Sequence, residues 1–251
     1  MTKQDIVTDL RPPESAVPIA RKLGAMTLLS DEELAFLEGL HSNSATITPE
    51  TDFIGDGEAF KATFIVVSGW AIRYVLTPSG RRQILSYALP GDILGLHVNF
   101  RRTSSYSAAA LTQLELAVVE PLRINEISQK YPVLAAGLSW CTAREFAILG
   151  DQTVRLGRLD ASKRLIHLLL ELWHRLRLVG ETKEDWFEFP MTQNDLADTL
   201  GLSLVHINRQ MQKLKKLGLI TMDNGWLRLV NVPKLTEYAE FNPEHLQEFR
   251  I

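Results

Sequence analysis

The chain has 251 residues, of which 45% are hydrophobic and 23% charged, and its formal net charge is −3. This composition is typical of a globular protein with one large or two ordinary domains. No apolar run reaches the length of a membrane span and residues 1–10 lack the apolar core of a signal peptide, so we expect a cytoplasmic protein. Cys141 is the only cysteine, which excludes an intrachain disulfide and a cysteine-based zinc or iron–sulfur site made by one chain.

Residues 1–27 are expected to form an N-terminal arm, loose as far as Pro18 because that part is polar and contains Pro12 and Pro13. A short helix should follow, since Ser30 can cap it and Glu33, three residues later, can bond back to the backbone of the cap.

Residues 28–121 are expected to form an antiparallel β-roll that serves as an effector or sensor domain. Short β-prone runs alternate with turn signals at the spacing of a sandwich or barrel. The runs are residues 63–67, 71–76, 83–88 and 114–119, and the turns include Ser68-Gly69, Thr77-Pro78-Ser79-Gly80 and Pro90-Gly91-Asp92.

Residues 122–157 are expected to hold a long dimerisation helix, which Pro132 starts after a short helix over residues 123–129. Two apolar rows run along it, so one row can lie on the barrel and the other on a second copy of the chain. The spacing does not decide which row does which. The rows are Val133, Ala136, Trp140, Ala147 and Val154, and beside them Leu134, Leu138, Cys141 and Ile148.

Residues 158–251 open with an expected helix over residues 160–178 and a strand over residues 186–189. A helix-turn-helix follows: Thr192 can cap a helix over residues 193–200, and Gly201 can end it in the left-handed conformation. Ser203 can cap a second helix that runs to about residue 217.

The second helix of this unit has an apolar face and a polar face. Leu204, Ile207, Met211 and Leu214 share the side expected to be buried, and the opposite side shows Val205, His206, Arg209, Gln210, Gln212 and Lys213. Residues 203–218 contain four cations and no acid, although the whole chain is acidic. A basic, polar helix of this kind favours binding in the DNA major groove over the alternative, a solvated helical hairpin in an ordinary α domain.

A hairpin is predicted after the helix-turn-helix, because Asp223-Asn224-Gly225 joins two short apolar runs at residues 219–222 and 226–230. Asn-Gly is the strongest two-residue hairpin signal. A helix-turn-helix followed by a hairpin is a winged helix, whose wing would lie against the DNA backbone.

The order β-roll, long helix and winged helix resembles the cAMP receptor protein/FNR family of bacterial transcription regulators, from about residue 28 to residue 234. Val67-Ser68-Gly69-Trp70, Gly80-Arg81-Arg82-Gln83-Ile84, Leu89-Pro90-Gly91-Asp92 and the helix-turn-helix carry the resemblance. Val205-His206-Ile207-Asn208-Arg209 looks like the recognition-helix variant of one FNR-like branch. The resemblance implies an α+β fold with a cyclic-nucleotide-binding-like jelly roll, and a homodimer that binds a palindromic DNA operator and contacts RNA polymerase.

The resemblance also assigns roles to residues near the DNA. Arg209 matches the arginine that the family uses in the groove, and a guanidinium can bond to guanine O6 and N7 together. Val205 and His206 are expected to tune the site, and Val205 can touch a thymine methyl. Phosphate contacts are expected from Thr192, Gln193 and Ser203, and Gln210 and Lys213 complete the predicted DNA-binding set.

The sequence departs from the cAMP-binding members of the family. Those members carry Gly-Glu soon after the Pro-Gly turn and Arg-Ser or Arg-Thr further on, whereas this chain has Gly95-Leu96-His97 and Thr103-Ser104-Ser105-Tyr106-Ser107. Arg102-Thr103 falls a few residues early. The expected signal is therefore not cAMP, and any small-molecule effector is unidentified.

Several residues carry two interpretations, and no cofactor or metal is expected. His97 is either a loop histidine or a haem ligand, and Cys141 is either a small buried hydrophobe or a redox group. Arg81-Arg82 is expected to be a solvated turn edge, with an anionic ligand or RNA polymerase as the alternative.

Two other kinds of protein would suit parts of the pattern. A cupin-like metalloenzyme needs clustered histidine and carboxylate ligands, but only His41 and His97 fall in or beside the β region. An effector-free regulator would use the barrel only as a dimer scaffold. The sequence favours a regulator without enzymatic activity.

Overall fold

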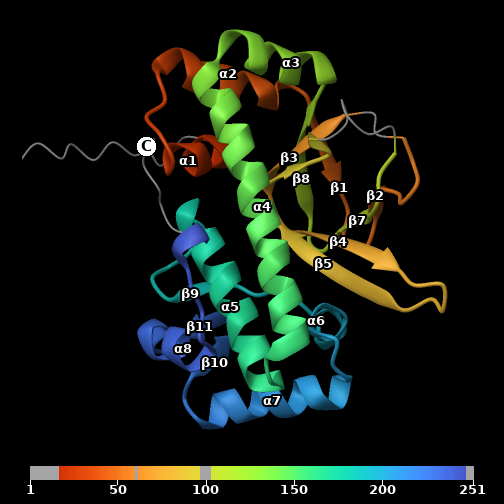
Figure 1. Ribbon diagram of the computed structural model, residues 1–251, viewed down its shortest axis with the longest axis vertical. Helices are drawn as coiled ribbons and strands as arrows, with labels where there is room; N and C mark the ends of the chain where they lie inside the picture. Colours follow the sequence, from red (N-terminus) through yellow and green to blue (C-terminus); the bar gives the residue numbers. More distant parts are fainter. Residues whose placement is uncertain (1–16, 60–61, 97–102, 247–251) are drawn as a thin grey trace, which may run out of the picture.

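The computed structural model describes residues 17–59, 62–96 and 103–246. A long helix, α4 (Pro132–Arg158), runs down the molecule and joins its two halves (Figure 1). The β-roll packs beside the upper part of α4, and the C-terminal domain surrounds its lower end (Figure 1). No helix in these ranges is long and apolar enough to cross a membrane.

The N-terminal segment is packed from residue 18 onward, the residue at which the predicted loose part of the arm ends. Helix α1 (Pro18–Gly24) has Pro18 in its first turn and buries Ile19 and Leu23. Leu23 fits against Gly137 of α4, where an added Cβ would lie 2.9 Å from a Leu23 methyl. Helix α2 (Asp31–Gly39) has the predicted capping box between Ser30 and Glu33.

The β-roll consists of two four-stranded antiparallel sheets. The first has the order β1 (Ser44–Ile47), β8 (Leu114–Val119), β3 (Thr63–Ser68) and β6 (Ile93–Leu94). The second has the order β2 (Asp52–Ile54), β7 (Ser107–Ala110), β4 (Ala71–Leu76) and β5 (Arg82–Ala88). The four predicted runs are confirmed as β3, β4, β5 and β8. Apolar side chains such as Val66, Ala108 and Leu116 fill the space between the sheets, because alternate strand residues face inward.

Helix α3 (Pro121–Lys130) leads into α4, and the structure assigns the two faces of α4. Leu134, Cys141 and Ile148 face the inside of the molecule. Phe146 is 78% exposed, Leu149 41% and Val154 52%. The row that includes Leu134 is therefore the inner one, and an apolar strip is left on the outer side of α4.

The C-terminal domain follows from α5 (Ala161–Leu178), which Asp160 caps. Its other elements are β9 (Trp186–Glu188), α6 (Gln193–Leu200), α7 (Leu204–Lys216), β10 (Ile220–Asp223), β11 (Trp226–Leu229), α8 (Val232–Ala239) and a short 3-10 turn over Glu244–Leu246. Strands pair in the order β10-β11-β9. Asn224 and Gly225 have φ of 45° and 82°, as the hairpin between β10 and β11 requires.

Candidate nucleic-acid interface and adjoining pocket

The helix-turn-helix has the three local devices that the sequence predicts. Thr192 Oγ1 accepts a hydrogen bond from the Asp195 backbone (3.2 Å), and the Asp195 carboxylate accepts one from the Thr192 backbone (2.9 Å). Gly201 ends α6 at φ 62°, which L residues with a side chain adopt only at a cost. Ser203 Oγ accepts from the His206 backbone (3.3 Å) at the start of α7. These caps define where α6 ends and where α7 begins.

The outer face of α7 is open to solvent. Val205 is 78% exposed, and His206, Arg209 and Lys213 are exposed beside it. In the described ranges, no hydrogen bond or ion pair engages the Arg209 guanidinium. Thr192, Gln193 and Ser203, at the starts of α6 and α7, are exposed as well. Helix α7 lies at the end of the molecule farthest from α2 and α3 (Figure 1).

Two predictions about the faces of α7 are wrong. Gln210 is 8% exposed, and its Oε1 accepts a hydrogen bond from Ser162 Oγ of α5 (2.6 Å), because Gln210 shares the inward side with Ile207 and Leu214. Leu204 is 47% exposed, because the first turn of α7 projects beyond the core. Lys213 is exposed but also donates to Ser162 Oγ (3.0 Å). Gln210 is therefore removed from the DNA-facing set.

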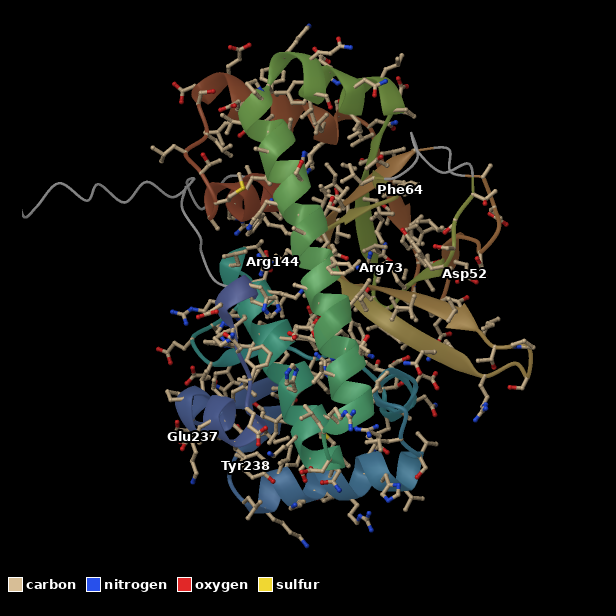
Figure 2. All side chains as sticks on the ribbon, in the orientation of Figure 1. Asp52, Phe64, Arg73, Arg144, Glu237 and Tyr238 are labelled. Atoms are coloured by element: carbon tan, nitrogen blue, oxygen red, sulfur yellow. The ribbon has the colours of Figure 1, made fainter. Side chains whose placement is uncertain are left out.

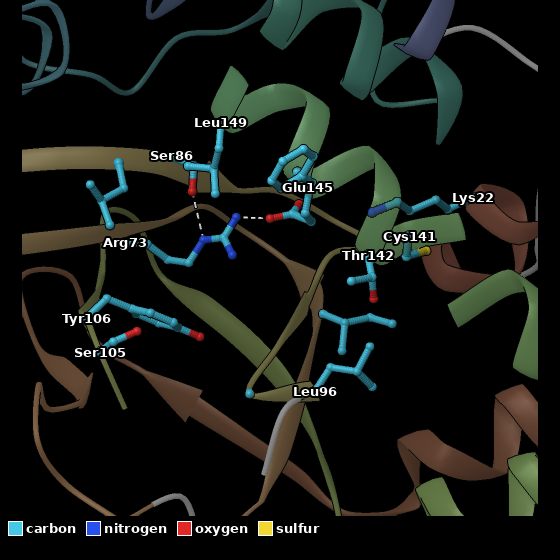
Figure 3. A pocket seen from close by; sticks show the side chains of 14 residues that line it. Lys22, Arg73, Ser86, Leu96, Ser105, Tyr106, Cys141, Thr142, Glu145 and Leu149 are labelled. Carbon is cyan, nitrogen blue, oxygen red and sulfur yellow. Dashed lines mark hydrogen bonds and ion pairs between the residues drawn. The ribbon is translucent and has the colours of Figure 1, made fainter. Parts of the chain in front are cut away.

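A pocket of about 330 Å³ lies between the β-roll and α4 (Figure 3). Arg73 of β4 forms an ion pair with Glu145 of α4, and Arg73 Nε donates to Ser86 Oγ of β5 (2.7 Å). Burial alone would lower the pKa of Arg73, but the Glu145 carboxylate overrides it and raises that pKa above its usual value. The guanidinium is thus a fixed positive charge, already neutralised by a side chain from the opposite wall.

The remaining walls of the pocket are mainly apolar. Leu96 and Leu149 contribute apolar surface, with Tyr106 on the sheet side and Thr142 on the helix side (Figure 3). Cys141 also lines the pocket, and burial raises the pKa of its thiol, which disfavours the reactive thiolate. His97 and Arg102 lie outside the described residues.

A buried ionic network joins the β-roll to α1 and α5. Asp92, in the Pro-Gly-Asp turn, accepts hydrogen bonds from Lys22 (2.6 Å) and Arg175 (2.5 Å). Arg175 also pairs with Glu171 (3.0 Å), and Glu171 pairs with Arg155 of α4. Burial would raise the pKa of Asp92, but the two cations lower it well below its usual range, so Asp92 is ionised.

Arg144 of α4 lies beside this network, but its charge is not paired with a carboxylate among the described residues. Its Nη2 donates to the Leu246 carbonyl (3.0 Å), and burial lowers its pKa to about 10. Figure 2 shows Arg144 and Arg73 on the two sides of α4.

Sequence reasoning missed the ion pairs of Arg73 and Arg82, because their partners are distant in the sequence. Arg82 is not a solvated turn edge: it pairs with Asp195 and Asp198 of α6, both at 2.7 Å. The available signal was a charged residue that alternates with apolar residues in a strand. That signal places the charge on the face opposite the apolar residues and does not show that another element covers that face.

The described part of the chain contains no group of three or more histidine, cysteine or acidic side chains placed to hold a metal ion. The ligand cluster of the cupin alternative is therefore not assembled within those ranges.

Comparison with known proteins gives two family matches. Residues 45–131 match the cyclic nucleotide-binding domain, and residues 163–238 match the Crp-like helix-turn-helix domain.

Similar whole chains are known from several bacteria. The nitrogen fixation regulation protein FixK of Bradyrhizobium diazoefficiens is 30% identical over 174 residues, which cover 69% of this chain and 72% of FixK. The transcriptional activator protein FnrL of Cereibacter sphaeroides is 30% identical over 195 residues, which cover 76% of this chain and 77% of FnrL. The solved structure of FixK2 from Bradyrhizobium japonicum superimposes with a TM-score of 0.68 at 25% identity, covering 78% of this chain and 96% of that one.

The folds of the two halves, their order along the chain and these relatives all indicate the same family. The chain belongs to the CRP/FNR family of DNA-binding transcription regulators.

Proposed function

We propose that the protein is a homodimeric, sequence-specific regulator that places α7 in the major groove of a palindromic operator. The observation that carries this proposal is the exposed N-terminal half of α7, where Val205, His206 and Arg209 face solvent together. An α-helix fits the major groove, and its first turns reach the base edges. Thr192, Gln193 and Ser203 are exposed at the starts of α6 and α7, where polar side chains and backbone amides suit phosphate oxygens.

Dimerisation through α4 is supported by the apolar strip on its outer side. Phe146, Leu149 and Val154 lie within about two turns of α4 and are 41–78% exposed, which is unusual for a monomer surface. Two copies of α4 packed along this strip would place two α7 helices for half-sites about one helical turn apart.

We further propose that the pocket between the β-roll and α4 receives a small-molecule effector other than cAMP. Its volume lies at the lower end of the range usual for ligand sites, and both the sheet and α4 contribute to it. A ligand there would touch the helix that is proposed to form the dimer. The alternative is a dimer that needs no effector. An affinity for DNA that stays the same when cell extracts are added would favour this alternative.

The relatives named above are regulators, and we propose that this chain likewise acts without catalysis, in the cytoplasm, through contacts with DNA and RNA polymerase. Its role as an activator or a repressor depends on where its operator lies.

The proposal is tested by comparing Arg209→Ala with Lys215→Ala on DNA. A palindromic duplex is first selected from a random library by the wild-type protein, and affinities for it and for random DNA are then measured at one salt concentration. Arg209→Ala should weaken binding to the selected duplex by about 1–3 kcal/mol and affect random DNA less. Lys215, exposed on the last turn of α7, serves as the matched loss of one positive charge. Equal losses on both DNAs for Arg209→Ala would make Arg209 a phosphate contact and contradict its assignment.

A further inference from the structure

The β-roll is bonded directly to the first helix of the helix-turn-helix. Arg82 of β5 donates from Nη2 to Asp195 Oδ1 and from Nε to Asp198 Oδ2, each at 2.7 Å. Gln83 Nε2 donates to the Asp198 carbonyl at 2.7 Å. The two aspartates lie one turn apart on α6, so a single guanidinium spans that turn.

Deeper contacts continue this connection. Tyr87 of β5 is fully buried, and its hydroxyl lies 2.6 Å from Thr199 Oγ1 of α6. Gln152 Nε2 of α4 donates to the Thr199 carbonyl at 2.8 Å. Helix α6 is therefore held at its first turn by Arg82 and near its end by β5 and α4 together.

Asp195 performs two tasks at once. Its Oδ2 accepts from the Thr192 backbone and hydroxyl in the capping box, while its Oδ1 accepts from Arg82. The side chain that caps α6 is thus also the one that the β-roll holds. Residues 201–203 alone separate α6 from α7, so we expect a displacement of α6 to move α7 with it.

We infer that Arg82 is a positioning residue for DNA binding: it acts from the β-roll, through Asp195 and Asp198, to hold α6 and α7 in the orientation that meets the operator. The inference rests on the proposed placement of α7 in the groove. The same strand, β5, lines the effector pocket with Leu85 and Ser86. Strand β5 therefore touches both the pocket and the helix-turn-helix.

A simpler account is that Arg82 only screens two acidic groups from DNA phosphates. The two accounts differ in what they predict for Asp198→Asn. Removal of an acid near DNA should strengthen binding if charge alone matters. Removal of a bond that positions α6 should weaken it. Asp198 is suited to this test because its side chain takes no part in the capping box.

The experiment measures affinity of the full chain for the selected duplex and for random DNA by fluorescence anisotropy at fixed salt. Arg82→Ala is expected to weaken binding to the selected duplex on the order of tenfold, the size of a typical coupling between sites. Asp198→Asn should also weaken it, and Arg82→Asp combined with Asp198→Arg should recover part of the loss. Arg81→Ala is the matched control, since Arg81 is exposed on the same hairpin and carries the same charge. Thermal unfolding of each variant checks that the fold is kept.

Three results would overturn the inference. They are unchanged binding by Arg82→Ala, tighter binding by Asp198→Asn, or equal losses by Arg82→Ala and Arg81→Ala. A wild-type chain that selects no duplex would overturn the proposed function as well, whereas selection by the wild type with any of these three results would overturn the positioning role alone.

Discussion

His167 of α5 is a buried residue whose protonation should destabilise the fold. It is 6% exposed, and the Arg155 guanidinium approaches its Nδ1 at 3.3–3.4 Å. Burial, and next the positive charge of Arg155, lower the pKa of His167 to about 4. The imidazole is therefore neutral in the folded protein, with a lone pair that faces the guanidinium.

The consequence is a loss of stability in mildly acidic solution. In the unfolded chain a histidine takes up a proton near pH 6.5, whereas in the folded chain His167 does so only near pH 4. The unfolded state thus binds more protons than the folded state between these pH values. The stability associated with neutral His167 is therefore complete above pH 6.5 and is lost as the pH falls toward 4. We expect the stability of His167→Gln to differ less between pH 7 and pH 5 than that of the wild type, by up to about 2 kcal/mol.

Urea unfolding at the two pH values measures this difference. His206→Gln, a substitution at an exposed position of α7, is the matched control. An equal loss of stability between pH 7 and pH 5 in the wild type and in His167→Gln would contradict the role of His167. Ion pairs lower the pKa values of the Asp92 and Glu171 carboxyls. The stability that these ion pairs contribute is therefore lost only at more acidic pH.

At the scale of single elements, dimerisation through the outer face of α4 can be tested independently of DNA binding. Phe146→Asp should convert a dimer into a monomer at micromolar concentration, because each two-fold interface would receive two charges in place of two large apolar groups. A weakening of a hundredfold or more is expected, roughly 3 kcal/mol. Leu122→Asp is the control, since Leu122 is 73% exposed on α3 but lies off the strip.

Analytical ultracentrifugation of both variants, with and without the selected duplex, gives the answer. A Phe146→Asp chain that remains dimeric, or a wild type that is monomeric even on DNA, would rule out the α4 strip as the interface.

Elements were predictable from the sequence where their cause is local. The capping box of Ser30 and Glu33, the cap at Thr192 and the Asn224-Gly225 turn involve neighbours within three residues, and all three are confirmed. The face of α7 was harder to predict, because Gln210 is polar yet lies on the inward side with Ile207 and Leu214, where Ser162 of α5 supplies its hydrogen bond. Helix α1 was missed because its burial depends on α4, more than a hundred residues later.

At the scale of the whole molecule, charged groups connect the halves in ways that no local pattern shows. Lys22 meets Asp92, Arg73 meets Glu145 and Arg82 meets Asp195 across separations of 70 to 113 residues. Each pair joins a different pair of elements, so its geometry arises only when those elements dock. The exposed, basic side of α7 follows from the sequence, whereas the ionic contacts that link the pocket, α4 and α6 do not.

The ion pairs at the pocket also affect whether a cyclic nucleotide can bind there. Of the described residues that line the pocket, the cations are Lys22 and Arg73, and each is already in an ion pair, with Asp92 and Glu145. A cyclic phosphate would have to compete with Glu145 for Arg73 or with Asp92 for Lys22. Taking Arg73 would leave Glu145 unpaired in a partly dehydrated space, and that cost offsets the new contact. Glu145 is likewise occupied by Arg73 and is not free to accept from ribose hydroxyls.

We therefore expect cAMP and cGMP to bind more weakly than micromolar. Isothermal titration calorimetry of each nucleotide into the full chain measures this, and retention of the selected duplex by the same preparation shows that the protein is active. A dissociation constant at or below micromolar for either nucleotide would contradict this expectation.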